Sequence, residues 1–239
     1  MRYARLLATF ASWVICSTGA NAQSLQLHPV TLELVGQQRA ASLVITNTDT
    51  RASIVQVRAF LWKQAADGDE LTPTRQLVLS PPITEIPPGG TQVVRLLLRE
   101  PPGASEGAYR ILIDGLPPAT GQNGVRMGLR FSVPVFVATR AGLEPDLSFR
   151  VEVLADGTAE LVARNQGQKH ARVTNPVLKV GEAKPLEVKA GLHPYVLASS
   201  ERRWRVLGDT GPLKTENQTQ VVAKIGQTEI SEKAEIVRP

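Results

Sequence analysis

Apolar and polar side chains alternate through much of the chain beyond its first 23 residues. The longest alternating run is VRMGLRFSVPVFV at 125–137, where every odd-numbered position is apolar. A period of two residues over this length predicts a β-strand with one apolar face. Pro134 lies inside the run, and because proline has no N–H to donate, its presence predicts that the strand lies at the edge of a sheet.

Short runs rich in Val, Ile and Leu recur between turn residues at the spacing typical of an all-β sandwich. Seven strands are predicted in the first part of the chain, near 25–34, 39–47, 52–62, 75–80, 91–99, 108–116 and 125–138. Turn-forming proline and glycine residues, such as those at 87–90, separate them. After the first residues no stretch keeps a helical apolar stripe over three turns, so we expect little helix.

A segment at 140–145 has the glycine and proline expected of a short linker. A second β domain follows, beginning with a hairpin in which alternating residues flank the tight turn Asp156-Gly157. Its strands are predicted near 149–154, 158–164, 171–180, 186–189, 194–198, 201–207, 219–225 and 228–237. The predicted fold class is therefore all-β, with domains at 23–139 and 146–239.

The first residues have the layout of a secretory signal peptide. Arg2 and Arg5 precede an apolar stretch that ends in small residues, and we place the cut after Ala22, giving a signal peptide at 1–22. The alternative is an uncleaved anchor. No later segment approaches the roughly 20 apolar residues of a transmembrane helix, so we expect no membrane insertion after cleavage. The only cysteine, Cys16, lies in the signal peptide, and the mature chain can form no disulfide.

Charge argues against a nucleic-acid partner. Without Arg2 and Arg5, 25 basic residues face 22 acidic ones, a net charge of about +3, and the basic residues are scattered. Nucleic-acid-binding domains instead concentrate basic residues in a patch or stripe. A solvated surface is the simpler interpretation, and a mildly basic surface suited to acidic partners is the alternative.

No combination of residues predicts catalysis, a metal site or a cofactor. Ser105 lies in a G-x-S-x-G pattern, but the hydrolase elbow of that spacing needs a strand before and a helix after, whereas two prolines precede and a predicted strand follows. His28, His170 and His193 lack metal-ligand spacing and are expected at the surface or at strand ends. The acidic residues at 67–70 could attract calcium, but a hairpin turn is the better interpretation.

Eight stretches, in this order, resemble the periplasmic chaperones of chaperone-usher pilus assembly. They are Leu27–Leu34, Ala41–Asn47, Val55–Trp62, Leu79–Pro82, Ile86–Gly89, Thr91–Leu96, Ala108–Ile113 and Val133–Val137, and Ser199–Trp204 adds a ninth in the second half. The sequence SVPVFV at 132–137 resembles more closely the archaic or alternative branch of that family.

The resemblance implies two immunoglobulin-like sandwich domains arranged as a boomerang, with a pilus subunit bound by the cleft and by the edge strand before the linker. The implied protein is a non-enzymatic periplasmic chaperone that completes the subunit's fold with its own strand and delivers it to an outer-membrane usher. The residues expected to fill the subunit's pockets are Val125, Met127, Leu129 and Phe131, whereas Val133 and those beyond it return to the chaperone's core. On periodicity alone, the simpler alternative is that all the odd-numbered residues face the domain's own interior.

Many family members anchor the subunit's terminal carboxylate through an arginine on the first strand and a lysine on the donor strand. The aligned positions here hold Thr31 and Pro134. Nearby candidates for a charge-assisted contact with the carboxylate are Arg95, Arg126 and Arg130. The alternative is that these arginines are solvated and keep an apolar edge strand soluble.

The resemblance also assigns Glu106 to an ion pair between the domains. The usual arginine partner aligns with Ala138, which leaves the nearby Arg140 as the candidate partner. Two other function classes stay open: a structural pilin or adhesive module, and a secreted hydrolase acting through Ser105. A pilin should have a detachable N-terminal arm, whereas residues 24–34 look like an integral first strand.

Overall fold

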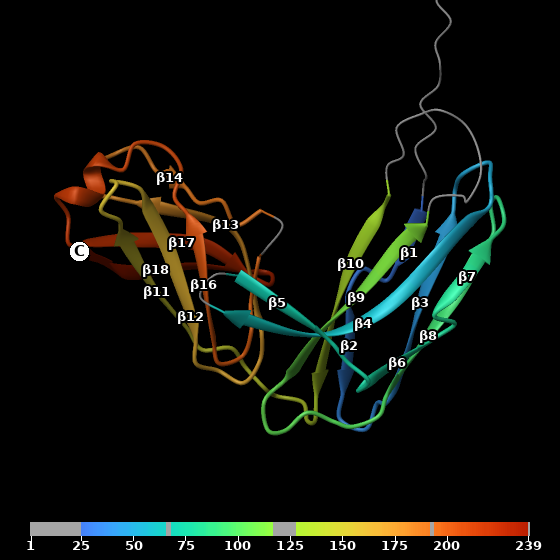
Figure 1. The fold of residues 1–239 in the computed structure, drawn as a ribbon. Helices are drawn as coiled ribbons and strands as arrows, with labels where there is room; N and C mark the ends of the chain where they lie inside the picture. The colour runs from blue at the N-terminus through green and yellow to red at the C-terminus, as the bar shows by residue number, and fades with distance from the viewer. Residues whose placement is uncertain (1–24, 66–67, 117–127, 192–193, 239) are drawn as a thin grey trace, which may run out of the picture.

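The computed structural model describes residues 25–65, 68–116, 128–191 and 194–238, which form two lobes joined at an angle (Figure 1). The first lobe contains β1 to β10 and the second contains β11 to β18. Strand β10 ends at Ala138 and β11 starts at Leu147, and we propose the linker at 140–145 within this interval. The expected signal peptide and residues Val125, Arg126 and Met127 lie outside the described residues.

The first domain is a sandwich of two sheets. One sheet has the strand order β1-β3-β8-β6, and the other has the order β2-β10-β9-β4-β5, with β7 also paired to β4. The strands are β1 (Leu25–His28), β2 (Leu32–Val35), β3 (Ala40–Asn47), β4 (Ser53–Ala65), β5 (Gly68–Pro73), β6 (Leu77–Ser80), β7 (Ile83–Ile86), β8 (Thr91–Leu98), β9 (Gly107–Leu116) and β10 (Arg130–Ala138).

Alternation along the strands builds the core between these sheets. Odd-numbered residues of β4, β9 and β10 face inward, and Val55, Ile111, Ile113 and Val135 are fully enclosed. Burial of this apolar surface stabilises the domain without any disulfide. The even-numbered residues of the same strands consequently lie on the opposite face of the sheet.

The structure differs from the predicted strands at three places. The predicted strand 25–34 is two strands, β1 and β2, which belong to different sheets, because the chain crosses between sheets at 29–31. Strands β5 and β7 were not predicted: β5 is mostly polar and β7 has only four residues between prolines. Residues 68–70, predicted as part of a turn, belong to β5, while 66 and 67 lie outside the described residues.

The second domain is built from one sheet of eight strands with the order β14-β13-β17-β18-β11-β12-β16 and with β15 paired to β13. These strands are β11 (Leu147–Val153), β12 (Ala159–Asn165), β13 (Ala171–Lys179), β14 (Leu186–Glu187), β15 (Tyr195–Val196), β16 (Ser200–Arg205), β17 (Gln218–Ile225) and β18 (Thr228–Val237). A single-turn 3₁₀-helix, η1, spans Gly211–Lys214.

This sheet curls around its own core until its two ends meet. A bridge joins Val188 to Val206, and backbone hydrogen bonds run from Lys189 N to Arg205 O (2.9 Å) and from Leu207 N to Glu187 O (2.7 Å). The enclosed core includes Trp204 of β16. Across the described ranges no helix has the length and apolar character needed to span a bilayer.

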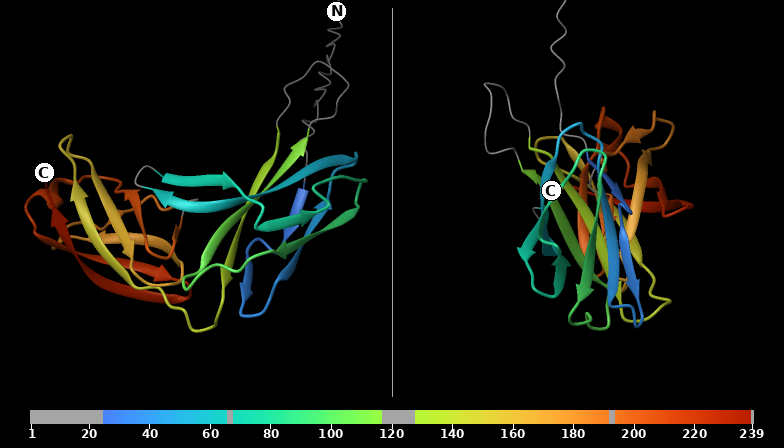
Figure 2. Two further views of the ribbon diagram at one scale, coloured as in Figure 1. Left: turned by 60° about the horizontal axis from the view of Figure 1, so that its bottom comes forward. Right: turned by 90° about the vertical axis from the view of Figure 1, so that its right-hand side faces the viewer.

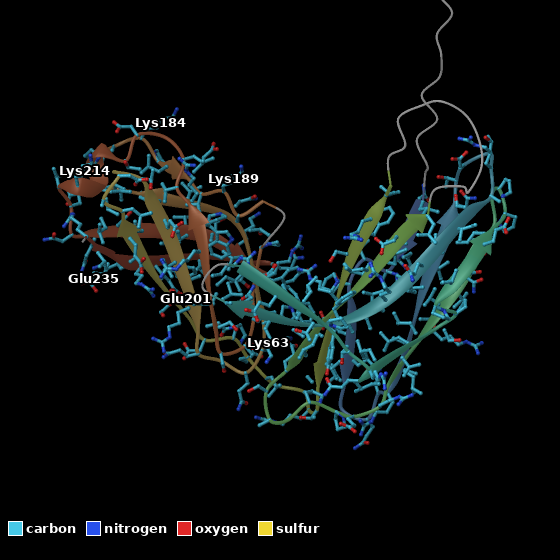
Figure 3. All side chains as sticks on the ribbon, in the orientation of Figure 1. Lys63, Lys184, Lys189, Glu201, Lys214 and Glu235 are labelled. Atoms are coloured by element: carbon cyan, nitrogen blue, oxygen red, sulfur yellow. The ribbon has the colours of Figure 1, made fainter. Side chains whose placement is uncertain are left out.

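The hairpin of β4 and β5 extends from the first lobe and lies beside the second, as two further views show (Figure 2). Its end contacts β16. In Figure 3, the labelled side chain of Lys63 lies close to this end of β4, near the junction between the lobes. The angle between the lobes is therefore supported by the hairpin as well as by the chain connection after β10.

Candidate functional site

The even-numbered residues of β4, β9 and β10 form a surface that we call the inner face, because it points away from the first-domain core and toward the second lobe. Near the junction, Trp62, Ala108 and Phe136 of this face form an apolar cluster with Leu197 of the second domain. The strand register places the residues farther out in three rows across β4, β9 and β10, namely Phe60, Arg110 and Pro134; Arg58, Leu112 and Ser132; and Gln56, Asp114 and Arg130.

Strand β10 has two neighbours over only part of its length. Residues 135–138 pair with β2 in parallel orientation, and 135–137 also pair with β9 in antiparallel orientation. Residues 130–134 pair with β9 alone among the strands of the described chain. We call 130–134 the free-edge half and 135–138 the paired half of β10. The sequence-based prediction of an edge strand is thus correct for the first half only.

The position of Pro134 follows from the directions of the backbone groups. Leu129 O accepts a bond from Gly115 N (2.8 Å) on the β9 side, and Ala138 O accepts one from Gly36 N (2.9 Å) on the β2 side. Because successive residues of a strand direct their polar groups to alternate sides, the nitrogen of Pro134 faces away from β9. Proline therefore costs no hydrogen bond with β9, and it stands where the free edge ends and β2 begins.

Side-chain burial also changes along β10, between Ser132 and Val133. Leu129 and Phe131 are half-buried at the margin of the first-domain core. From Val133 to Ala138 every residue is buried. Val133, Val135 and Val137 belong to the core, as predicted. Leu129 and Phe131 are therefore in contact with their own domain without being sealed within it.

The structure does not bring the three candidate anchoring arginines together. Arg130 binds the carboxylate of Asp114, which also accepts a hydrogen bond from Arg58 (2.6 Å). Arg95 lies on β8 in the opposite sheet, and Arg126 is outside the described residues. Burial by itself raises the pKa of Asp114, but hydrogen bonds and charge from Arg130 and Arg58 outweigh burial and hold the pKa below its usual range.

Arg110 is an inner-face cation that the sequence analysis did not single out. It lies opposite Pro134 in the strand register, and its guanidinium carbon is 3.7 Å from the centre of the Trp62 ring. The carboxylate of Asp69, which is paired with Arg202, raises the pKa of Arg110 through its charge. Burial outweighs this effect and lowers the pKa of Arg110 below its usual value. An arginine in the middle of the apolar strand 108–113 was the available signal.

The β4–β5 hairpin is fixed to the second domain by polar contacts. The Gln64 side-chain amide donates to Tyr195 O (2.8 Å) and accepts from Leu197 N (2.9 Å). Arg202 forms an ion pair with Asp69 (2.6 Å). Burial raises the pKa of Asp69, but the Trp62 indole and the Arg202 guanidinium beside it lower the pKa and outweigh burial.

Glu106 does contact the second domain, but through a different residue from the one expected. Its carboxylate accepts hydrogen bonds from the backbone N of His170 (2.9 Å) and is 2.6 Å from His170 Nδ1. Arg140 instead donates to the side chain of Gln168 (2.9 Å). The His170 ring stacks on Phe136 with centroids 3.5 Å apart, and its side chain is 10% exposed. His170 directly precedes β13, so it is a strand-end residue, as expected.

The surroundings of Ser105 do not form a nucleophile elbow. Ser105 lies in a bend two residues before the start of β9, so a strand follows it, as the sequence indicated. In the part of the chain that the structure describes, no group of His, Cys, Asp and Glu side chains could hold a metal ion. His193 lies outside that part.

Comparison with known families adds to this geometry. Residues 24–141 match the family described as "Pili and flagellar-assembly chaperone, PapD N-terminal domain". Through its first domain, the chain belongs to this chaperone family. The matched residues contain both sheets of the first domain and the whole of β10. A comparison with curated proteins finds no match.

Solved structures with the same fold include pilus chaperones. One is a chain of the CsuC–CsuE chaperone–tip adhesion subunit pre-assembly complex from archaic Csu pili of Acinetobacter baumannii, with 24% identity, a TM-score of 0.66, and coverage of 90% of this chain and 99% of that chain. Another is the CupB2 chaperone of Pseudomonas aeruginosa, with 13% identity, a TM-score of 0.58, and coverage of 89% and 100%.

A third is a chain of the Salmonella enterica SafA pilin–SafB chaperone complex, with 14% identity, a TM-score of 0.57, and coverage of 89% and 94%. These similarities extend over both lobes. They confirm the predicted all-β architecture of two immunoglobulin-like domains arranged as a boomerang.

Proposed function

We propose that this member of the pilus-chaperone family acts in the periplasm, captures pilus subunits by strand addition along β10 and delivers them to an outer-membrane usher. The observation that carries the proposal is the free-edge half of β10, whose even-numbered residues direct backbone groups to an unpaired edge. An added strand gains affinity through such backbone bonds and specificity through alternate side chains. The SafA–SafB and CsuC–CsuE complexes, which pair a chaperone with a subunit, support it.

The side chains of the same segment suit this role. Leu129 and Phe131, half-buried at the core margin, remain accessible to a subunit that lacks a strand. With Val125 and Met127 they complete the proposed set of pocket-filling residues. Binding of an incomplete sandwich would cover this apolar margin and the exposed edge at the same time.

The structure does not favour a pilin. Residues 25–28 pair with β3 and residues 32–35 pair with β10, so the N-terminal strands belong to the sheets of their own domain. A pilin needs such a segment free to complete a neighbouring subunit. A second domain, held to the first by Gln64 and Asp69, also follows.

The position of Arg110 supports a proposal for where the bound subunit chain ends. Strand β2 occupies the edge of β10 from Val135 onward, so a strand added to the free-edge half must stop near Pro134. Thr31, the other aligned anchor position, directly precedes β2. Because Arg110 lies opposite Pro134 and its guanidinium lies over Trp62 on the inner face, we propose that it receives the terminal carboxylate of a subunit strand that runs parallel to β10.

The test of strand addition compares two Leu→Glu variants in co-expression with a pilus subunit that lacks its N-terminal arm. Leu129→Glu is expected to abolish the soluble one-to-one complex, measured by size-exclusion chromatography, while the melting temperature of the free protein falls by only a few degrees. The matched control is Leu97→Glu, because Leu97 is 51% exposed on the opposite sheet. Equal complex yields from both variants would contradict strand addition.

The test of Arg110 uses peptides with the subunit's C-terminal sequence, one ending in a carboxylate and one in an amide. Arg110→Met should weaken binding of the acid peptide about tenfold or more, because hydrogen bonds to charged groups contribute about 1.5–3 kcal/mol. Binding of the amide should change little. The control is Arg95→Met on the opposite sheet. The same loss for both peptides would assign Arg110 to packing on Trp62 alone.

A further inference from the structure

The carboxylate of Asp114 connects three neighbouring strands in the row of the inner face farthest from the junction. Asp114 lies on β9, opposite Arg130 of β10 and Gln56 of β4. Arg130 and Arg58 both bind its carboxylate, and Asp114 is only 9% exposed. The side chain of Arg130 is more than half exposed. A largely buried anion therefore fixes the first residue of β10 to its neighbour.

The free-edge half needs such fixation more than the paired half does. Shifting a strand by one residue transfers every side chain to the other face of the sheet. In the paired half, burial on both faces and two neighbouring strands oppose a shift. In the free-edge half only β9 is a neighbour. Val133 and Pro134 are buried there, but Arg130 and Ser132 are exposed and Phe131 is half-buried. A bulge near Ser132 would be enough to shift the residues before it.

We infer that Asp114 is a positioning residue that keeps the strand-donating part of β10 in register. The inference rests on the proposed function, because register decides which side chains a bound subunit meets. With Arg130 held on the inner face, Leu129 and Phe131 stay on the opposite face with their backbone groups toward β9. Loss of the Asp114 charge lets this segment shift by one residue. Arg130 then turns toward the core face, and an apolar neighbour turns toward the inner face.

Cysteine pairs can report the register in the free protein, because the chain has no cysteine other than Cys16. The pair Leu112→Cys with Ser132→Cys reports the observed register, since these residues lie opposite each other. The pair Leu112→Cys with Phe131→Cys reports a one-residue shift. Disulfide geometry requires facing positions with Cα atoms about 4.4–6.8 Å apart, so each pair responds to one register.

Each pair is combined with Asp114→Asn, with Arg130→Gln, or with the control Glu70→Gln on β5 of the same sheet. Asp114→Asn and Arg130→Gln are each expected to raise the yield of the shifted cross-link about threefold or more and to lower the yield of the in-register cross-link. This size of change is typical for loss of a partly exposed charge pair. The control should leave both unchanged. Unaltered cross-link ratios in both variants would overturn the inference.

Subunit capture provides the second readout. Asp114→Asn should reduce capture of an arm-deleted subunit, and oxidation of the in-register Leu112→Cys/Ser132→Cys pair should restore it, which a loss of overall stability alone does not predict. Absence of rescue would overturn the role of Asp114 in donation. If the unmodified protein captures no subunit, the proposed function fails, while the cross-link ratios in the free protein still decide whether Asp114 sets the register.

Discussion

The two halves of β10 differ in nearly every property that the rest of the domain controls. Residues 135–138 have strands on both sides and are buried on both faces, with Phe136 packed on the second domain. Residues 130–134 have a strand on one side only, and Arg130, Phe131 and Ser132 are exposed or half-buried. The length of β2, rather than the composition of β10, therefore decides which residues of β10 remain available for pairing with a strand of another chain.

The same difference extends to the way each half is held. The paired half is fixed mainly by apolar burial, which needs no charge and is not directional. The first residue of the free-edge half is fixed by the ion pair of Arg130 with Asp114. Three experiments test this contrast.

The largest expected effect is that of Val135→Glu. Val135 is fully buried between β2 and β9, so the substitution places a carboxylate in an apolar core. We expect a loss of at least about 4 kcal/mol in the free energy of unfolding, enough to prevent folding of many domains. The yield of soluble protein and thermal denaturation followed by circular dichroism measure it. A melting temperature close to that of Leu129→Glu would remove the distinction between the halves.

Phe136→Ala is expected to have a smaller effect, about 3 kcal/mol, because it removes a buried aromatic ring without introducing charge. The ring is 1% exposed and stacks on His170 across the junction. Phe131→Ala, on the half-buried face of the free-edge half, is the matched comparison and should cost clearly less. Urea unfolding of the two variants measures both values, and equal midpoints would contradict the expected order.

The smallest effect concerns pH and the free-edge half. The pKa of Asp114 is lower in the folded protein than its usual value, so near pH 4 the unfolded chain binds more protons at this position. The stability contributed by Asp114 is therefore present above its unfolded pKa and lost as pH falls through the folded value. Asp114→Asn should therefore reduce the dependence of the free energy of unfolding on pH between about pH 5 and pH 2. Unfolding midpoints measured across this range, with Glu70→Gln as control, would show an unchanged slope if the prediction is wrong.

Local pattern was sufficient to predict most strands and the two-domain all-β fold. The two-residue period at 125–137 and the position of Pro134 together indicated an edge strand with an apolar face. What the pattern could not show is where the edge ends, because this depends on pairing with β2, about 100 residues earlier in the chain. Strand β5 was not predicted for a similar reason. Its residues are mostly polar, and they form a strand because they pair with β4.

The candidate site was less predictable because its contacts join distant residues. Asp114 and Arg130 are 16 positions apart, and Glu106 and His170 are 64 positions apart. Sequence proximity suggested Arg140 for Glu106, whereas the approach of the second domain brings His170 to it. Arg110 has a visible signal, a cation within an apolar strand, but its significance depends on Pro134 lying opposite and Trp62 beneath it.

The meeting of the two sheet ends in the second domain limits where the molecule can associate with other chains. At the bridge between Val188 and Val206, backbone donors and acceptors that would otherwise be available to a foreign strand are already satisfied within the sheet. Unpaired strand edges are the usual starting points of aggregation. In a crowded compartment, unwanted contacts between copies should therefore begin at the first lobe. A subunit bound there would also prevent association between copies of the chaperone.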